Sequence, residues 1–230
     1  MALLEELVAL VAPPRCAVCG AAGASAGEVL CAACRRGLAW LPDPRCRRCA
    51  LPLPHARGGH CPATHAAFDT AWAAVAYEGA ARQMLLALKF AAARPLADVM
   101  AAQILAAVQI DSQATLVVVP AHPRRRRARG FDAAELIAAA LARRSGLALH
   151  RGLRRGGGAS RQLGASRAQR RSPAGLDFRA RGVAPARVVL VDDVHTTGAT
   201  LDACAAALRC AGSLHITAIT WARTLDDCPR

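Results

Sequence analysis

The sequence predicts an α/β protein with a mainly parallel sheet, preceded by a small cysteine-rich module. Two apolar runs, 115–119 and 188–191, lack polar alternation, which is typical of parallel strands covered on both faces. The second run leads into a helical pattern and a further strand over 214–221, which together make a strand–helix–strand unit. Seven of the ten cysteines lie within the first 61 residues. We therefore expect an N-terminal helix and cysteine module over 1–66 and an α/β domain over 67–230.

The N-terminal cysteines keep a fixed register. Three Cys-x2-Cys pairs begin fifteen residues apart, and a single cysteine stands where a fourth pair would begin. Paired knuckles of this kind place four ligands around a tetrahedral ion, so we expect two zinc ribbons in series, with one or two structural zinc ions. The first site is complete and consists of Cys16, Cys19, Cys31 and Cys34.

The second site has only three cysteines, Cys46, Cys49 and Cys61. The register places Thr64 where an eighth cysteine would be, and His65 is next to it. We favour His65 as the fourth ligand, because Cys-x3-His lets a longer side chain reach the missing position. His60 is the main rival, and an incomplete second ribbon is the other alternative.

A disulfide framework is the alternative to zinc for these cysteines, and it requires an oxidising compartment. The chain begins Met-Ala-Leu-Leu-Glu-Glu-Leu, which is acidic where a signal peptide is basic. We therefore expect reduced thiols, a cytoplasmic location and no membrane span. Few large apolar residues accompany the cysteines, so metal binding would supply much of the folding free energy of this module.

The middle of the chain is strongly basic. The formal net charge is +14, and residues 121–182 hold sixteen arginines against three acids. Such a density fits polyanionic partners such as pyrophosphate, RNA or DNA, although a solvated basic surface explains most of the arginines equally well. The segment 154–172 is rich in glycine, serine and arginine, and reads as either a mobile loop over a site or a surface linker.

A basic loop is expected after the strand over 115–119. The run Arg124–Arg127 and Arg129 follow that strand, and a helix is predicted from Asp132, which has capping-box spacing to Glu135. Carboxyl ends of parallel strands meet at one edge of a sheet, and ligands bind there. This loop could therefore neutralise pyrophosphate at that edge.

The most specific motif is Val188–Thr200, in which a buried strand runs into two acids, a threonine-rich loop and a helix. Unpaired amides at a helix start, the helix dipole and threonine hydroxyls would bind a phosphate monoester. The two acids suit vicinal ribose hydroxyls or a nearby magnesium ion. The loop residues are Thr196, Thr197, Gly198, Ala199 and Thr200, and the acids are Asp192 and Asp193.

This motif resembles the phosphoribosyl pyrophosphate (PRPP) signature of type I phosphoribosyltransferases. Nearly the whole chain resembles the ComF/GntX family. Besides this motif, the resemblance rests on the three Cys-x2-Cys pairs, Tyr77–Gly79, Leu88–Phe90, Pro120–Pro123, Arg129–Asp132, Gln162 and Ala222–Arg223. The resemblance implies a double zinc ribbon joined to a type I phosphoribosyltransferase-like domain. It also implies a part in uptake of external DNA during natural competence, with single-stranded DNA and a helicase-type partner.

Two functions are therefore expected from the sequence. In the first, the protein binds PRPP with magnesium: the threonine loop grips the 5′-phosphate, Asp192 and Asp193 hold the ribose, and Lys89, Arg124 and Arg129 face pyrophosphate. In the second, the fold is a non-catalytic adaptor for nucleic acid or a helicase. Ordinary nucleobase salvage is a third and weaker reading, because it requires no double zinc ribbon.

Overall fold

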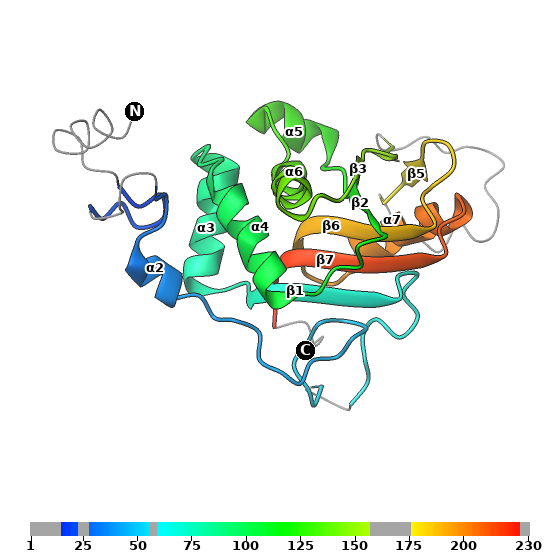
Figure 1. The fold of residues 1–230 in the computed structure, drawn as a ribbon, viewed down its shortest axis with the longest axis horizontal. Coiled ribbons are helices and arrows are strands. Elements are labelled where there is room, and N and C mark those ends of the chain that lie inside the picture. Colours follow the sequence, from blue (N-terminus) through cyan, green and yellow to red (C-terminus); the bar gives the residue numbers. More distant parts are fainter. Residues whose placement is uncertain (1–14, 23–27, 56–58, 157–175, 226–230) are drawn as a thin grey trace.

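The computed structural model describes residues 15–22, 28–55, 59–156 and 176–225. Its centre is a five-stranded, all-parallel sheet in the order β1-β7-β6-β2-β3 (Figure 1). A second, two-stranded antiparallel sheet pairs β4 with β5. The strands are β1 Thr70–Ala76, β2 Thr115–Val118, β3 Leu149–His150, β4 Leu153–Arg155, β5 Phe178–Ala180, β6 Arg187–His195 and β7 His215–Arg223.

Helices cover both faces of the central sheet, as the unbroken apolar strands predicted. Helices α3, α4 and α6 pack on one face, whereas α7 packs on the other (Figure 1). Successive residues of β6 alternate between the two cores: Val189 and Val191 belong to the first, Val188 and Leu190 to the second. The helices are α2 Ala32–Arg36, α3 Gly79–Phe90, α4 Leu96–Ala107, α5 Pro123–Arg129, α6 Ala133–Ser145 and α7 Ala199–Cys210.

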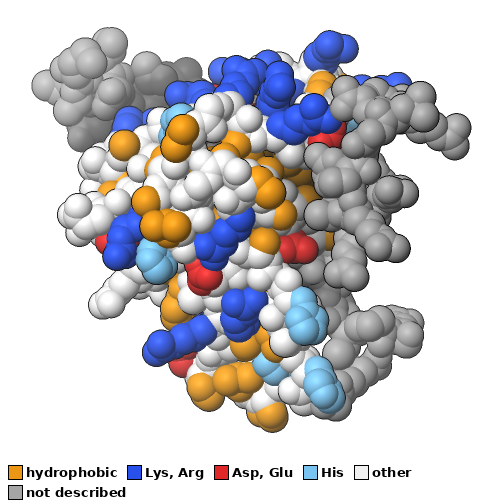
Figure 2. All heavy atoms as spheres, turned by 90° about the vertical axis from the view of Figure 1, so that its right-hand side faces the viewer, with side chains coloured by type: hydrophobic (Ala, Val, Ile, Leu, Met, Phe, Trp, Pro, Cys, Tyr) orange, Lys and Arg blue, Asp and Glu red, His pale blue; other side chains and the backbone are white. Residues whose placement is uncertain are grey.

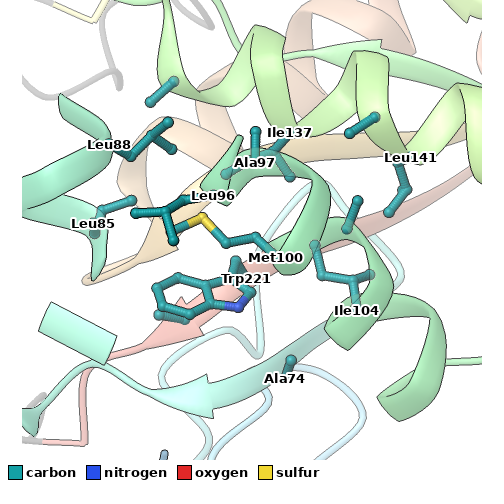
Figure 3. Close-up of a cluster of buried hydrophobic side chains, with 14 of the residues drawn as sticks. Ala74, Leu85, Leu88, Leu96, Ala97, Met100, Ile104, Ile137, Leu141 and Trp221 are labelled. Atoms are coloured by element: carbon teal, nitrogen blue, oxygen red, sulfur yellow. The ribbon is translucent and has the colours of Figure 1, made fainter. Parts of the chain in front are cut away.

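The larger core is built around Trp221 of β7. Its ring packs beneath Leu96 and Met100 of α4, and α3 and α6 complete the layer with leucine and isoleucine side chains (Figure 3). The indole Nε1 donates to Gln103 Oε1 at 2.7 Å, which satisfies both buried polar groups. This packing fixes α3 relative to β7 and β6, and therefore fixes the position of its last turn.

The segment predicted as a basic loop is instead the short helix α5. His122 Nδ1 accepts from Arg124 N at 3.2 Å at its start, Pro123 stands at its first position, and Gly130 ends it with φ 75°. These are the ordinary start and stop signals of a helix, and they prevail over repulsion among the arginines. The expected cap of the next helix is confirmed, because Asp132 accepts from Ala134 N.

The cysteine-rich module lies along β1 at the edge of the sheet. Residues 39–41 pair with β1 through an antiparallel bridge between Trp40 and Val75, and Leu41 N donates to Ala74 O at 3.1 Å. Backbone hydrogen bonds therefore join the module to the sheet directly. Most of the predicted 154–172 loop, Gln162 included, lies outside the described residues.

Candidate functional site

The first cysteine cluster has the geometry of a closed zinc site. The ligand atoms of Cys16, Cys19, Cys31 and Cys34 all lie within 4.8 Å of one another, and the Sγ atoms of Cys19 and Cys31 are 3.7 Å apart. A tetrahedral ion with Zn–S distances of about 2.3 Å requires Sγ–Sγ separations of about 3.8 Å. These four residues therefore fit a structural zinc ion, as predicted.

Backbone N–H groups favour the thiolate form of Cys16 in the same cluster, and the thiolate is the form that binds a metal cation. Burial opposes ionisation of Cys16, but backbone N–H groups, led by that of Cys31 at 3.4 Å, outweigh it and lower its pKa to about 6. Burial and neighbouring thiols raise the pKa of Cys34. Four thiolates cannot crowd together in protein alone, and a divalent cation removes that conflict.

The second cluster contains His55 as its fourth member. The ligand atoms of Cys46, Cys49, His55 and Cys61 lie within 4.8 Å of one another. Cys49 Sγ lies 3.2 Å from His55 Nε2, and the Sγ atoms of Cys46 and Cys61 are 3.6 Å apart. Burial and the neighbouring Cys46 raise the pKa of Cys49 to about 12. The donor set is again that of a structural zinc ion.

His55 takes the position for which His65 was favoured and His60 was the rival. After Cys49 the chain turns back along its own path, with Cys46 N donating to Leu51 O at 2.8 Å and Leu53 N to Pro44 O at 2.9 Å. This return brings residue 55 to the cysteines. His65 instead lines a cavity of about 180 Å³.

The acid pair lies at the carboxyl end of β6 beside the last turn of α3. Lys89 Nζ is 2.6 Å from Asp193 Oδ2, with both side chains less than one-fifth exposed. Asp193 N donates to Asp192 Oδ1 at 2.8 Å, which fixes the two carboxyls relative to each other. The sequence named these three residues separately, and the structure brings them together.

A third carboxyl, that of Asp132, adds to the negative charge at this edge. Burial, then repulsion from Asp193, raises the pKa of Asp192 well above its ordinary value. Burial and the charge of Asp193 also raise the pKa of Asp132, although the N–H of Ala121 opposes this shift. Asp132 was predicted as a helix cap and belongs to the Arg129–Asp132 segment of the family resemblance, but it was not predicted to join the acid pair. The edge has an excess of carboxyls over Lys89 and is suited to a cation or to hydroxyl donors.

The threonine loop leads directly from β6 into α7. Gly198 is the N-cap of α7 with φ 82°, and Thr197 Oγ1 accepts from Ala199 N at 3.4 Å at the start of the helix. A Cβ at this position would lie 2.8 Å from His195 Nε2, so only glycine fits. Thr196 and Thr197 are exposed. The positive end of the helix dipole and exposed hydroxyls therefore meet in this loop.

His195 lies beneath this loop as a neutral residue. It is 2% exposed, and burial, followed by the charge of Arg223, lowers its pKa to about 3. Its ring stands edge-on to Phe68 at a centroid distance of 6.2 Å. Within the described part of the chain its Nδ1 has no hydrogen-bond partner.

Helix α5 carries the arginines that were expected to face pyrophosphate. Arg124–Arg127 are exposed, and the guanidinium of Arg129 lies 4.8 Å from the centre of the Phe90 ring. Because Phe90 follows Lys89, this contact places the end of α5 next to the acid edge. Figure 2 shows Lys and Arg side chains gathered along the top of the molecule, the side on which α5 lies in Figure 1.

The comparisons with known proteins concern the N-terminal module. The Double zinc ribbon domain matches residues 7–65. No curated protein matches the chain. Among the described residues, no helix is both long and apolar enough to cross a membrane. The chain thus combines a double zinc ribbon and an α/β region built on a parallel sheet. The ribbon contains two groups of four cysteine or histidine residues, each able to hold one metal ion.

Proposed function

We propose that the α/β region is a type I phosphoribosyltransferase-like domain that binds PRPP or a related phosphorylated ribose with magnesium. One observation carries this proposal. The exposed Thr196 and Thr197 lead through a left-handed Gly198 into α7, a few residues after the acid pair of β6. Phosphate and ribose groups thus find their binding partners a few residues apart.

Each residue of the edge has a role in this proposal. The loop amides and threonine hydroxyls hold the 5′-phosphate, and Asp192 and Asp193 accept hydrogen bonds from the ribose hydroxyls. Lys89, held by Asp193, and the arginines of α5 meet the pyrophosphate charge. Magnesium would neutralise charge on the pyrophosphate. Two carboxylates offer few ligands for this ion, so phosphate oxygens would supply further ligands.

The reaction class is transfer of a phosphoribosyl group, in which pyrophosphate leaves the sugar as a base bonds to it. The ComF resemblance, together with the double zinc ribbon, favours a part in DNA uptake on the cytoplasmic side rather than nucleobase salvage. A transfer assay with PRPP and a panel of bases, read by pyrophosphate release, tests the catalytic part.

Binding is tested by isothermal titration calorimetry with PRPP and magnesium. The Asp192→Asn, Asp193→Asn double variant should bind at least tenfold more weakly, because it loses both charges that receive ribose and metal. Asp98→Asn is the matched control, since this acid pairs with Arg143 and Arg144 on the helical face, away from the loop. Equal heats from the wild type and the double variant would contradict the assignment.

A second candidate is a non-catalytic adaptor for single-stranded nucleic acid or a helicase. It is favoured by four consecutive exposed arginines on α5 and by Phe90, which is 68% exposed under the guanidinium of Arg129. Cations beside an exposed ring are the elements of a single-strand binding surface.

The adaptor is tested with a single-stranded oligonucleotide at several salt concentrations. Affinity should fall steeply with salt, and Arg125→Ser, Arg126→Ser should weaken binding and reduce the slope. Arg143→Ser, Arg144→Ser removes the same charge from α6 and should change neither. Absence of binding at low salt would exclude this candidate.

A further inference from the structure

One buried side chain, Arg223 at the end of β7, contacts both the second zinc ribbon and the threonine loop. It is 1% exposed. Its Nε donates to Cys49 O at 3.0 Å, and its Nη1 donates to His195 O at 2.9 Å and to Thr196 O. A residue of the second cysteine cluster, the last residue of β6 and the first residue of the threonine loop therefore share a single guanidinium.

These contacts determine where the loop amides point. Within a planar trans peptide the C=O and N–H groups point in opposite directions. Because the carbonyls of His195 and Thr196 face Arg223, the amides that follow them, those of Thr196 and Thr197, face away from it. The two N–H donors therefore point away from the buried Arg223, and both residues that carry them, Thr196 and Thr197, are exposed. Outward-facing amides are what an anion at a helix start requires.

The metal cluster fixes the other end of this link. Cys49 is 0% exposed, its Sγ belongs to the second cluster, and its carbonyl accepts from Arg223. The same cysteine lines the cavity of about 180 Å³ together with Thr197 and Gly198. Any movement of Cys49 on loss of the metal would therefore affect the loop in two ways. It would shift Arg223, which is hydrogen-bonded to both, and it would alter the cavity that Cys49 and the loop line together.

In the part of the first ribbon that the structure describes, there is no such link. Among the described residues, none of the hydrogen bonds of Cys16, Cys19, Cys31 and Cys34 reaches the loop. Their neighbours in the core belong to the cluster that includes α3 and α4. The two clusters thus offer a matched pair of metal sites, one connected to the loop and one not.

We propose that Arg223 is a positioning residue that couples metal binding at the second ribbon to phosphate binding by the threonine loop. With the metal bound, Cys49 holds Arg223, and Arg223 holds the amides of Thr196 and Thr197 outward. Without it, the loop loses this orientation and its affinity for a phosphate monoester falls. This inference rests on the proposed function, because it takes the loop as the phosphate site.

The test measures the affinity of ribose 5-phosphate by calorimetry in the full chain. Arg223→Lys keeps the charge but cannot bridge both partners, and Cys61→Ser removes a ligand of the second cluster. Each should weaken binding roughly tenfold, as loss of supporting residues around a site commonly does. Their combination should weaken binding no further than the stronger single variant, because both break the same link. Cys34→Ser, in the first cluster, should leave the affinity unchanged.

A second measurement uses the wild-type chain alone and holds even where a variant fails to fold. By reciprocity, saturating ribose 5-phosphate should raise the zinc affinity of the second cluster by the same factor that zinc raises phosphate affinity. Competition with a chromogenic chelator measures this factor, and the first cluster serves as the internal control. Glucose replaces ribose 5-phosphate in the blank.

The possible failures are distinguishable. If the wild type binds neither ribose 5-phosphate nor PRPP, the proposed function falls and the coupling falls with it. If the wild type binds ribose 5-phosphate, but binding is equal in Arg223→Lys and Cys61→Ser and zinc affinity is unchanged by the sugar phosphate, only the coupling is overturned.

Discussion

The two zinc ribbons share a knuckle but pack on different parts of the protein. Cys16 and Leu30 of the first join the core around α3 and α4, whereas Cys49 and Ala63 of the second join the core around α7, together with Phe68 just beyond the ribbon. Directly after the second ribbon, Ala67 N donates to Asp202 Oδ1 of α7 at 2.6 Å, which holds this end of the module against that helix. A repeated motif can thus acquire different neighbours, and among the described residues the second copy is the one that contacts the candidate phosphate loop.

The largest expected effect is on the zinc content, and it tests whether each ribbon has the four ligands assigned to it. We expect two zinc ions per chain, falling to one in Cys34→Ser and to one in His55→Ala, because each loses a ligand of one cluster. His65→Ala is the matched control and should retain both ions. Elemental analysis after gel filtration measures these contents. One ion in His65→Ala and two in His55→Ala would contradict the structure.

The next effect sharpens the difference in packing. Phe68→Ala should destabilise the protein by roughly 3–5 kcal/mol and Leu30→Ala by roughly 2–5 kcal/mol, since both side chains are buried. Of these two side chains, Phe68 is the one that stands against the His195 ring, so its removal, unlike that of Leu30, should admit water there and raise the pKa of His195 from about 3 toward its ordinary value. Urea denaturation and an NMR titration provide the two readouts. An unchanged His195 titration in Phe68→Ala would refute this distinction.

A smaller effect is expected from two arginines in corresponding regions. Arg48 of the second ribbon donates to the carbonyls of Ala63, Thr64, Ala66 and Asp69. Arg48→Gln should therefore cost roughly 2–3 kcal/mol. Arg35 of the first ribbon pairs with Glu28 while about half exposed, and Arg35→Gln should cost less than about 1 kcal/mol. Equal melting temperatures for the two variants would contradict the claim that Arg48 stabilises the protein more than Arg35 does.

The smallest effect concerns the acid edge of β6, which belongs to neither ribbon. The pKa of Asp192 is raised in the folded protein, so its ionisation opposes folding as pH rises through that value. Asp192→Asn should raise the melting temperature at neutral pH, and the gain should shrink as pH falls below about 4, where the unfolded carboxyl is also protonated. Scanning calorimetry across pH measures the difference. A gain that grows as pH falls would show that the sign is wrong.

The elements of the α/β region could be predicted because their signals are local. Apolar runs and helical spacing located β2, β6, α7 and β7 within a few residues. The cysteine register likewise located the first cluster. Helix α5 was wrongly predicted as a loop, although Pro123 and Gly130 supplied the start and stop signals that identify a helix.

Other features depend on contacts between distant segments. His55 joins its cluster because the chain doubles back after Cys49, a path set by pairing with residues 44–46. Arg223 bonds the carbonyl of Cys49 across 174 residues of sequence. Neither contact produces a spacing of residues in the sequence from which it could be predicted. A sequence pattern reveals residue types suited to a site, whereas the tertiary path decides which of them meet.

The short pairing of residues 39–41 with β1 has a consequence for handling the protein. Strand β1 is an outer strand of the sheet, and of its seven residues, Thr70–Ala76, six are apolar. An uncovered edge of this kind is a template for pairing with another chain. A fragment that starts at residue 67 would bare this edge and should self-associate. The stretch between the two ribbons therefore also protects the sheet against aggregation, and the ribbons are poor candidates for removal in any expression design.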